Sequence, residues 1–169
     1  MKDKLTLGRG AAGFVAVFLL MFSVCSTSLG QANWYVKVTG TGTQSGDSWT
    51  NACPLATAVA GMTTTQTSWV AAGTYNLAAE IAVLGGQQWY GGFAGTETDP
   101  SQRNLASNVT VLATSGSRAF WLNNYRLMRI DGFTLTGANI TGANSGAISS
   151  GGASPTYVRD VTIANCHIT

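Results

Sequence analysis

Short runs in which apolar and polar residues alternate recur along the chain, and each run is followed by glycine or polar turn residues. The most regular stretch spans residues 129–137, and a variant of it returns at residues 157–165. Both copies place a threonine between two apolar residues, as Phe133-Thr134-Leu135 and as Val161-Thr162-Ile163. This alternation predicts a half-buried strand, and its return predicts that equivalent strands stack on one another.

Strands of this kind follow one another at intervals of 20 or more residues, which is a spacing typical of the coils of a solenoid. They occupy residues 69–73, 89–93, 109–112, 133–135 and 161–163. Further apolar runs that can supply a second strand to each coil lie at residues 81–84, 120–122 and 146–148. The rhythm favours a parallel β-helix. A β-sandwich also has closely spaced short strands, but two-residue hairpin turns are scarce in this chain.

The region before these strands has a different pattern. An alternating strand at residues 34–38 leads into a loop of turn-forming residues at 40–48. Thr50 or Asn51 can then cap a short helix that has Pro54 in its first turn. The apolar face of this helix would consist of Leu55, Ala58, Val59 and Met62. We expect the helix to cover the open end of the β stack, where unpaired strand edges invite aggregation.

The N-terminus has the pattern of a secretory signal peptide. Three basic residues between positions 2 and 9 precede an uncharged apolar run at residues 11–24, with small residues before a cleavage point at 30 or 32. The run of about 14 residues is shorter than the roughly 20 that a membrane-spanning helix needs, which disfavours an uncleaved anchor. The mature protein is therefore expected outside the cell, at its surface or in the periplasm, with no membrane span. The predicted regions are a signal peptide (1–32), an N-terminal strand, loop and capping helix (33–67), and the first coils of a parallel β-helix (68–169).

The composition is that of a globular β protein. The chain has 169 residues, of which 9% are charged and 45% are hydrophobic, and 21 are glycine. These values suit one turn-rich domain and argue against disorder. The formal charge of +2 comes from the signal peptide, because its removal leaves six basic and six acidic residues. A balanced mature chain gives no reason to expect a nucleic-acid partner.

Cys53 and Cys166 are the cysteines that remain after cleavage. An oxidising environment would permit a disulfide between them, but they lie at opposite ends of the predicted stack. A disulfide requires Cα atoms within about 7 Å of each other. We therefore expect two separate, mostly buried thiols.

Segments spread over most of the mature chain carry a family resemblance; they are residues 34–37, 46–52, 69–75, 90–98 and 130–137. In these segments the chain resembles the secreted right-handed parallel β-helix repeat proteins of bacteria, which are pectin-lyase-like in fold. The resemblance implies an all-β, right-handed parallel β-helix, with the short helix as its N-terminal cap. The group includes large surface proteins, adhesin-like proteins and some polysaccharide lyases, so the resemblance implies fold and export rather than one activity.

The chain departs from this family pattern at its C-terminal end. It stops at residue 169, directly after a predicted strand, and has no capping segment there. We therefore expect the N-terminal part of a longer protein or a truncated one, incomplete at the C-terminus. An open last coil also predicts self-association.

A polysaccharide lyase of this fold would need carboxylates that hold Ca²⁺ and a nearby Arg or Lys as the base. The one candidate constellation is Asp131 and Asp160 on neighbouring coils, near Arg129 and Arg159. Ion pairs at strand starts explain these residues better than a calcium site does. We assign no catalytic residue, no metal ligand and no cofactor, and Ca²⁺ is the one candidate ion.

Aromatic residues suggest a second kind of site, because aromatic rings stack on sugars. Trp69 and Trp89 are expected in the core, whereas Trp121 has the polar neighbours Asn123 and Asn124. The sequence thus predicts an exported structural or adhesive β-helix protein, with a polysaccharide or cell-surface glycan as its partner. The alternative is the N-terminal part of a polysaccharide lyase or another carbohydrate-active enzyme. The candidate ligand-binding residues are Trp121, Asp131, Asp160, Arg129 and Arg159.

Overall fold

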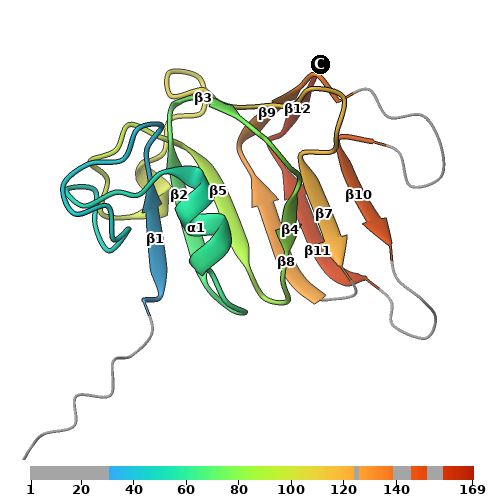
Figure 1. Cartoon of the computed structure of the whole chain (residues 1–169), viewed down its shortest axis with the longest axis horizontal. Coiled ribbons are helices and arrows are strands. Elements are labelled where there is room, and N and C mark those ends of the chain that lie inside the picture. Colours follow the sequence, from blue (N-terminus) through green and yellow to red (C-terminus); the bar gives the residue numbers. More distant parts are fainter. Residues whose placement is uncertain (1–30, 124–125, 139–145, 152–157) are drawn as a thin grey trace, which may run out of the picture.

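The computed structural model describes residues 31–123, 126–138, 146–151 and 158–169. In these residues the chain winds into a coil with three sides, and each side is an all-parallel sheet (Figure 1). The predicted signal peptide lies almost wholly outside the described residues. Within the described part, no helix is long and apolar enough to cross a membrane.

Each complete turn of the chain adds one strand to each of the three sheets. Sheet A has the order β1 (Asn33–Val36), β2 (Thr67–Ala71), β5 (Gln88–Phe93), β8 (Arg126–Asp131) and β11 (Arg159–Ala164). Sheet B has the order β3 (Gly73–Asn76), β6 (Thr110–Ala113), β9 (Phe133–Thr136) and β12 (His167–Ile168). Sheet C has the order β4 (Ile81–Val83), β7 (Phe120–Asn123) and β10 (Ile148–Gly151).

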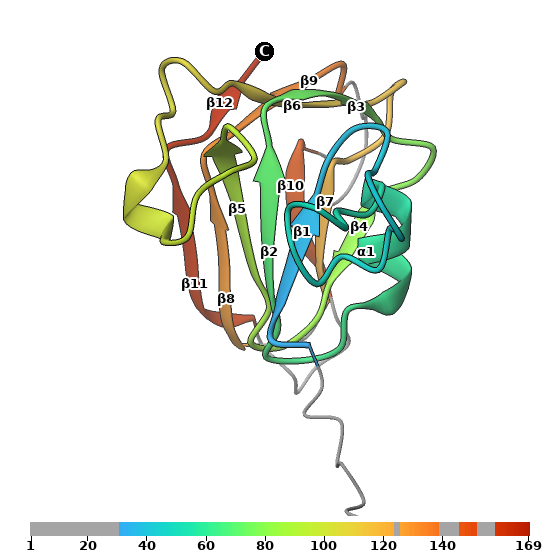
Figure 2. The same ribbon diagram turned by 90° about the vertical axis from the view of Figure 1, so that its left-hand side faces the viewer.

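The coil has the right-handed winding that was expected. Seen from the N-terminal end, the chain rises along sheet A, crosses the top in sheet B and descends in sheet C while it recedes from the viewer (Figure 2). This clockwise path is right-handed, as parallel crossovers almost always are. The fold is therefore a right-handed parallel β-helix with one short helix near its N-terminus.

The core fills the centre of the coil, because every strand turns alternate residues inward. Phe120 from sheet C lies between Trp89 from sheet A and Phe133 from sheet B, with ring centroids 6.2 and 5.6 Å away. All three side chains are buried. Aliphatic residues from the three sheets complete the core; among them are Val36, Val70, Ile81, Leu112, Met128, Ile130 and Leu135.

The repeat that the sequence suggested was assigned in the wrong register. Sheet A pairs Val161 with Met128, and sheet B pairs His167 with Thr134. The stretch 133–135 therefore belongs to sheet B and 161–163 to sheet A, so they are not equivalent strands. Residues 109–112 likewise contribute to sheet B and do not continue the series that β2 and β5 begin. Alternation identifies a strand with one buried face, but it does not say which of the three sheets the strand joins.

The second strands expected at 81–84, 120–122 and 146–148 are confirmed, with small shifts, as β4, β7 and β10. They pair in parallel to form sheet C.

Helix α1 (Leu55–Gly61) closes the first coil, on the side that sheet C occupies in later coils (Figure 2). Leu55, Ala58 and Met62 are buried, as the helical spacing predicted. The expected cap at Thr50 or Asn51 is wrong. Pro54 occupies the N-cap in an extended conformation and makes no side-chain cap, because the chain is still pairing with β1 at Cys53.

Cys53 and Cys166 are separate free thiols, as expected. Burial raises the pKa of each thiol, so both are less reactive than an exposed cysteine.

Phe133→Ala should destabilise the protein by about 3–5 kcal/mol, because it leaves a cavity where the three sheets meet. Chemical denaturation of the wild type and the variant measures the difference. Thr134→Ala is the matched control, since its side chain points away from the core. Equal losses from the two variants would contradict the inward assignment of Phe133.

The last described coil exposes apolar side chains at the end of the stack. Ile163 and Ile168 are 51% and 59% exposed. We propose that these exposed apolar side chains mediate self-association. Ile168→Lys should lower the sedimentation coefficient seen at high concentration, whereas Leu105→Lys, at an exposed apolar position in a loop, should not. A wild-type chain that stays monomeric at every concentration would refute the proposal.

Candidate binding face on the outer side of sheet A

A row of in-register side chains crosses the outer face of sheet A. Tyr35 on β1 pairs with Trp69 on β2, which pairs with Tyr90 on β5, and Tyr90 pairs with Asp131 on β8. These residues point outward because their strand neighbours point into the core. Trp69 is therefore buried, as expected, but outside the coil and not in its core. Trp89 is in the core, as predicted.

A β-bulge adds a further ring to this face. The register between β2 and β5 shifts after Trp69, so that Ala71 pairs with Phe93. This places the Phe93 ring on the Trp69 ring, stacked with centroids 5.0 Å apart. The bulge falls at Gly91 and Gly92, and Gly92 has a φ of 91° that glycine adopts without strain.

The loop between β1 and α1 supplies Trp49, which covers one end of the row. Its ring contacts Tyr35 and Phe93, with centroids 5.0 and 5.6 Å away. Its indole Nε1 donates to the carbonyl of Glu97, 2.8 Å away in the loop after β5. Trp49 therefore joins two loops that are distant in sequence, and the aromatic contacts add stability beyond the buried area.

An open hollow of about 510 Å³ lies where these two loops meet. Its lining combines a ring, hydroxyl groups and an ammonium group: Lys37, Thr41, Trp49, Thr50, Gly95 and Thr96. Lys37 Nζ donates to the carbonyl of Trp49 at 3.2 Å and lies 5.8 Å from its ring centroid. Among the described residues, no carboxylate lies within ion-pair distance of Lys37. The hollow therefore has a cation whose charge no carboxylate in the described part of the chain neutralises.

Glu97 is close to this hollow, but its carboxylate is hydrogen-bonded within its own loop. Its carboxylate accepts hydrogen bonds from the backbone N–H groups of Ala94, Gly95 and Thr96, at 2.6–2.9 Å. Burial would raise the pKa of Glu97, but these backbone donors hold it below its ordinary value. The ionised side chain thus shapes the loop that forms one wall of the hollow.

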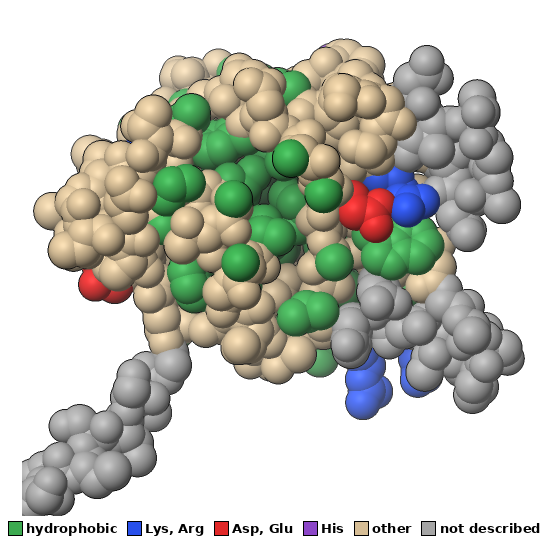
Figure 3. All heavy atoms as spheres, in the orientation of Figure 1, with side chains coloured by type: hydrophobic (Ala, Val, Ile, Leu, Met, Phe, Trp, Pro, Cys, Tyr) green, Lys and Arg blue, Asp and Glu red, His purple; other side chains and the backbone are tan. Residues whose placement is uncertain are grey.

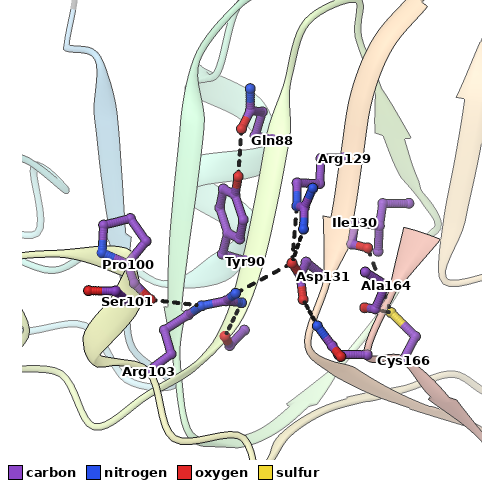
Figure 4. A network of polar contacts seen from close by, with 12 residues as sticks. Gln88, Tyr90, Pro100, Ser101, Arg103, Arg129, Ile130, Asp131, Ala164 and Cys166 are labelled. Atoms are coloured by element: carbon purple, nitrogen blue, oxygen red, sulfur yellow. Dashed lines mark hydrogen bonds and ion pairs between the residues drawn. The ribbon is translucent and has the colours of Figure 1, made fainter. Parts of the chain in front are cut away.

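Asp131, at the other end of the row, is the centre of a polar network (Figure 4). Its side chain is only 1% exposed, and Arg129 Nη2 and Arg103 Nη2 donate to one carboxylate oxygen at 2.7 and 3.4 Å. Asn165 Nδ2 donates to the other oxygen at 2.8 Å. The three donors come from β8, from the loop after the short 3₁₀ helix η1 (Pro100–Gln102), and from the turn before β12. Burial alone would raise the pKa of Asp131, but these hydrogen bonds hold it below its ordinary value.

Tyr90 lies beside this network. The guanidinium carbons of Arg103 and Arg129 are 4.9 and 5.6 Å from its ring centroid, and its hydroxyl donates to Gln88 at 2.7 Å. Arg103 also donates to the carbonyls of Gly91 and Pro100. The network therefore holds the long loop between β5 and β6 against sheet A, with Arg129 remaining partly exposed.

The structure separates the residues that the sequence grouped together. Arg129 and Asp131 are in contact, but the neighbour of Asp131 on the next coil is Ala164. Asp160 and Arg159 lie at the other end of β11 and are exposed. The described residues contain no group of three His, Cys, Asp or Glu side chains that could hold a metal ion, because the six carboxylates are scattered over three loops and two strands.

Trp121 lies on a different side of the molecule, on sheet C. The guanidinium carbon of Arg118 is 4.3 Å from its ring centroid, and Arg118 in turn pairs with Glu80 at 2.6 Å. Trp121 therefore does not share a surface with the Arg129–Asp131 network.

Sequence reasoning missed Lys37, Trp49, Tyr90 and Arg103. The outward positions of Tyr35 and Tyr90 could have been read from strand alternation. The places of Trp49 and Arg103 could not, because both lie in long loops whose return path is set by tertiary contacts.

The fold and this face define the class of the protein as a parallel β-solenoid with an aromatic and basic outer surface. No family model, no curated protein and no solved structure matches the chain.

Asp131→Asn should lower stability by about 3 kcal/mol at pH 7, because it removes the charge that two arginines neutralise. The pKa of Asp131 is lower in the folded state, so its contribution is present above the unfolded-state pKa of about 3.9 and is lost as pH falls through the folded value. Denaturation curves from pH 7 to pH 2 should therefore show the variant and wild type converging in acid.

Asp99→Asn is the control for this experiment, since Asp99 is an exposed carboxylate that caps η1. It should change stability much less at pH 7. A difference between Asp131→Asn and wild type that stays constant down to pH 2 would contradict the ionised network.

Proposed function

We propose that the protein is an exported β-solenoid of the bacterial surface or medium, with a structural or adhesive role, and that it binds carbohydrate at the Lys37–Trp49 hollow. The fold supports this proposal, because the sequence resembles secreted right-handed β-helix proteins with a pectin-lyase-like fold. The apolar segment at residues 11–24, with basic residues before it, supports export. A rigid stack of coils is also a suitable scaffold for a repeated surface protein.

The chemistry of the hollow is the observation that carries the proposal. A sugar ring presents an apolar face and a rim of hydroxyl groups, and the hollow offers partners for both. Trp49 provides a ring, Thr41, Thr50 and Thr96 provide hydroxyls, and Lys37 provides donors that are only partly used. Its volume of about 510 Å³ lies in the range usual for small-molecule sites, about 300–1,000 Å³.

A second hollow, of about 530 Å³, suits carbohydrate less well. It lies between α1 and the segment that joins β3 to β4, and hydrophobic side chains line its floor (Figure 3). Its surface comes mainly from aliphatic groups such as Leu55, Val59 and Ile81. Few polar groups are available there to replace the water that surrounds sugar hydroxyls. We therefore place the carbohydrate site at the Lys37–Trp49 hollow.

The test is glycan binding by the purified mature chain, first on a glycan array and then by calorimetry with the best ligand. Lys37→Met should weaken binding by about tenfold, as expected when a hydrogen bond from a charged group is lost. Thr50→Val should weaken it by about two- to tenfold. Neither change touches the core, so melting temperatures should stay close to the wild-type value.

Trp121→Ala is the matched control, because it removes an aromatic side chain from sheet C, away from the hollow. It should leave the affinity unchanged. Absence of saturable binding to any glycan, or an equal loss from Trp121→Ala and Lys37→Met, would refute this assignment.

A further inference from the structure

Most carboxylates of the mature chain have partners within the protein. Glu80 pairs with Arg118, and Asp131 pairs with two arginines. Side-chain or backbone donors hold the others, which are Asp47, Glu97 and Asp99. Of the six, Asp160 alone has no hydrogen bond or ion pair within the described part of the chain. Most of the acidic groups are therefore paired or hydrogen-bonded within the protein.

Arg126 and Arg159 remain without a carboxylate partner among the described residues. The adjoining segments 124–125 and 152–157 contain no Asp or Glu. Asp160 is next to Arg159 in sequence, yet it makes no ion pair within 4 Å. These two arginines are therefore not in an ion pair with any carboxylate of the described residues.

The register of sheet A places these two charges directly opposite each other. Arg126 on β8 pairs with Arg159 on β11, and neighbouring strands are about 4.8 Å apart. Both residues are exposed, and Figure 3 shows basic side chains projecting at the edge of the molecule where β8 and β11 begin. Like charges at directly opposed positions destabilise a sheet. An anion bound between the two arginines would remove this cost.

The same backbone conformation follows each arginine. Leu127 and Asp160 occupy equivalent positions after them and have φ values of 61° and 54°. Side chains other than glycine rarely adopt this region. Its appearance in both coils at one register position shows that the two arginines are presented in the same way.

Arg129 adds a third guanidinium group on β8. It is two positions beyond Leu127, and its side chain is 36% exposed. Its Nε and Nη2 atoms donate to Asp131, and its Nη1 has no acceptor among the described residues. Three guanidinium groups thus lie on two adjacent strands, each able to bind a carboxylate, sulfate or phosphate through two parallel hydrogen bonds.

We propose that Arg126, Arg159 and Arg129 form a site for a glycan that carries oxyanion groups, with the polymer crossing β8 and β11. A glycan suits the site better than a nucleic acid, because only three cations gather here and the mature chain has no net positive charge. The site is distant from the Lys37–Trp49 hollow along sheet A, and it does not depend on binding there.

The experiment uses the mature chain and five polymers of similar length: neutral dextran, dextran sulfate, polygalacturonate, phosphorylated dextran and single-stranded DNA. At least one anionic glycan should bind, neutral dextran should not, and salt should weaken the binding. The anionic glycan that binds with the highest affinity identifies the oxyanion as sulfate, carboxylate or phosphate.

Arg126→Gln/Arg159→Gln should weaken binding of that glycan by roughly two- to thirtyfold, the range expected for two exposed ion pairs. In the absence of glycan, the melting temperature of the double variant should equal or exceed the wild-type value, because the opposed charges are gone. This readout separates loss of binding from loss of fold.

Arg118→Gln is the control for a single charge and should leave the affinity unchanged, while Arg159→Gln should lower it. Wild-type affinity in the double variant would overturn the proposal. Tighter binding of DNA than of every anionic glycan, or no binding of any anionic glycan, would also overturn it.

Discussion

The structure depends on in-register stacking of parallel strands from successive coils. A single coil has three short strands, and none of them is stable alone. Stacking satisfies the backbone hydrogen bonds of each coil with those of the next and aligns the inward-facing side chains of successive coils in the core. The contacts of Phe120 with Trp89 and Phe133 show how one buried residue connects all three sheets. The same register aligns the outward-facing side chains of the described strands into rows.

The outer face of sheet A illustrates that consequence. The register that aligns core residues also aligns Tyr35, Trp69, Tyr90 and Asp131 across four strands. Long loops then fold back onto this row, one through Trp49 and the other through the 3₁₀ helix η1 and the loop that follows it. The hydrophobic contacts fix one end of the row, and the buried charge of Asp131 fixes the other. A regular scaffold thereby carries irregular loops in definite positions, which is what a binding surface requires.

Much of the fold could be predicted from the sequence, because alternation reports directly on which strand face is buried. The parallel β-helix followed from the spacing of such strands, the three strands of sheet C followed from apolar runs, and the buried face of α1 followed from helical spacing. The repeat register did not: Val161 pairs with Met128, and the partner of Thr134 is His167. Coils of variable length allow several alignments of similar strands, and only packing in three dimensions selects one.

The sequence by itself determined the kind of coil, since short alternating strands separated by turn residues can bury their apolar faces only by stacking. It also determined that the carboxylates are scattered along the chain. Only the tertiary structure decided which charges meet. Asp131 receives two arginines and an asparagine from three separate segments, while Arg126 and Arg159 face each other with no carboxylate partner in the described chain. Loop return and strand register bring such groups together, and both arise from contacts between residues that are far apart along the chain.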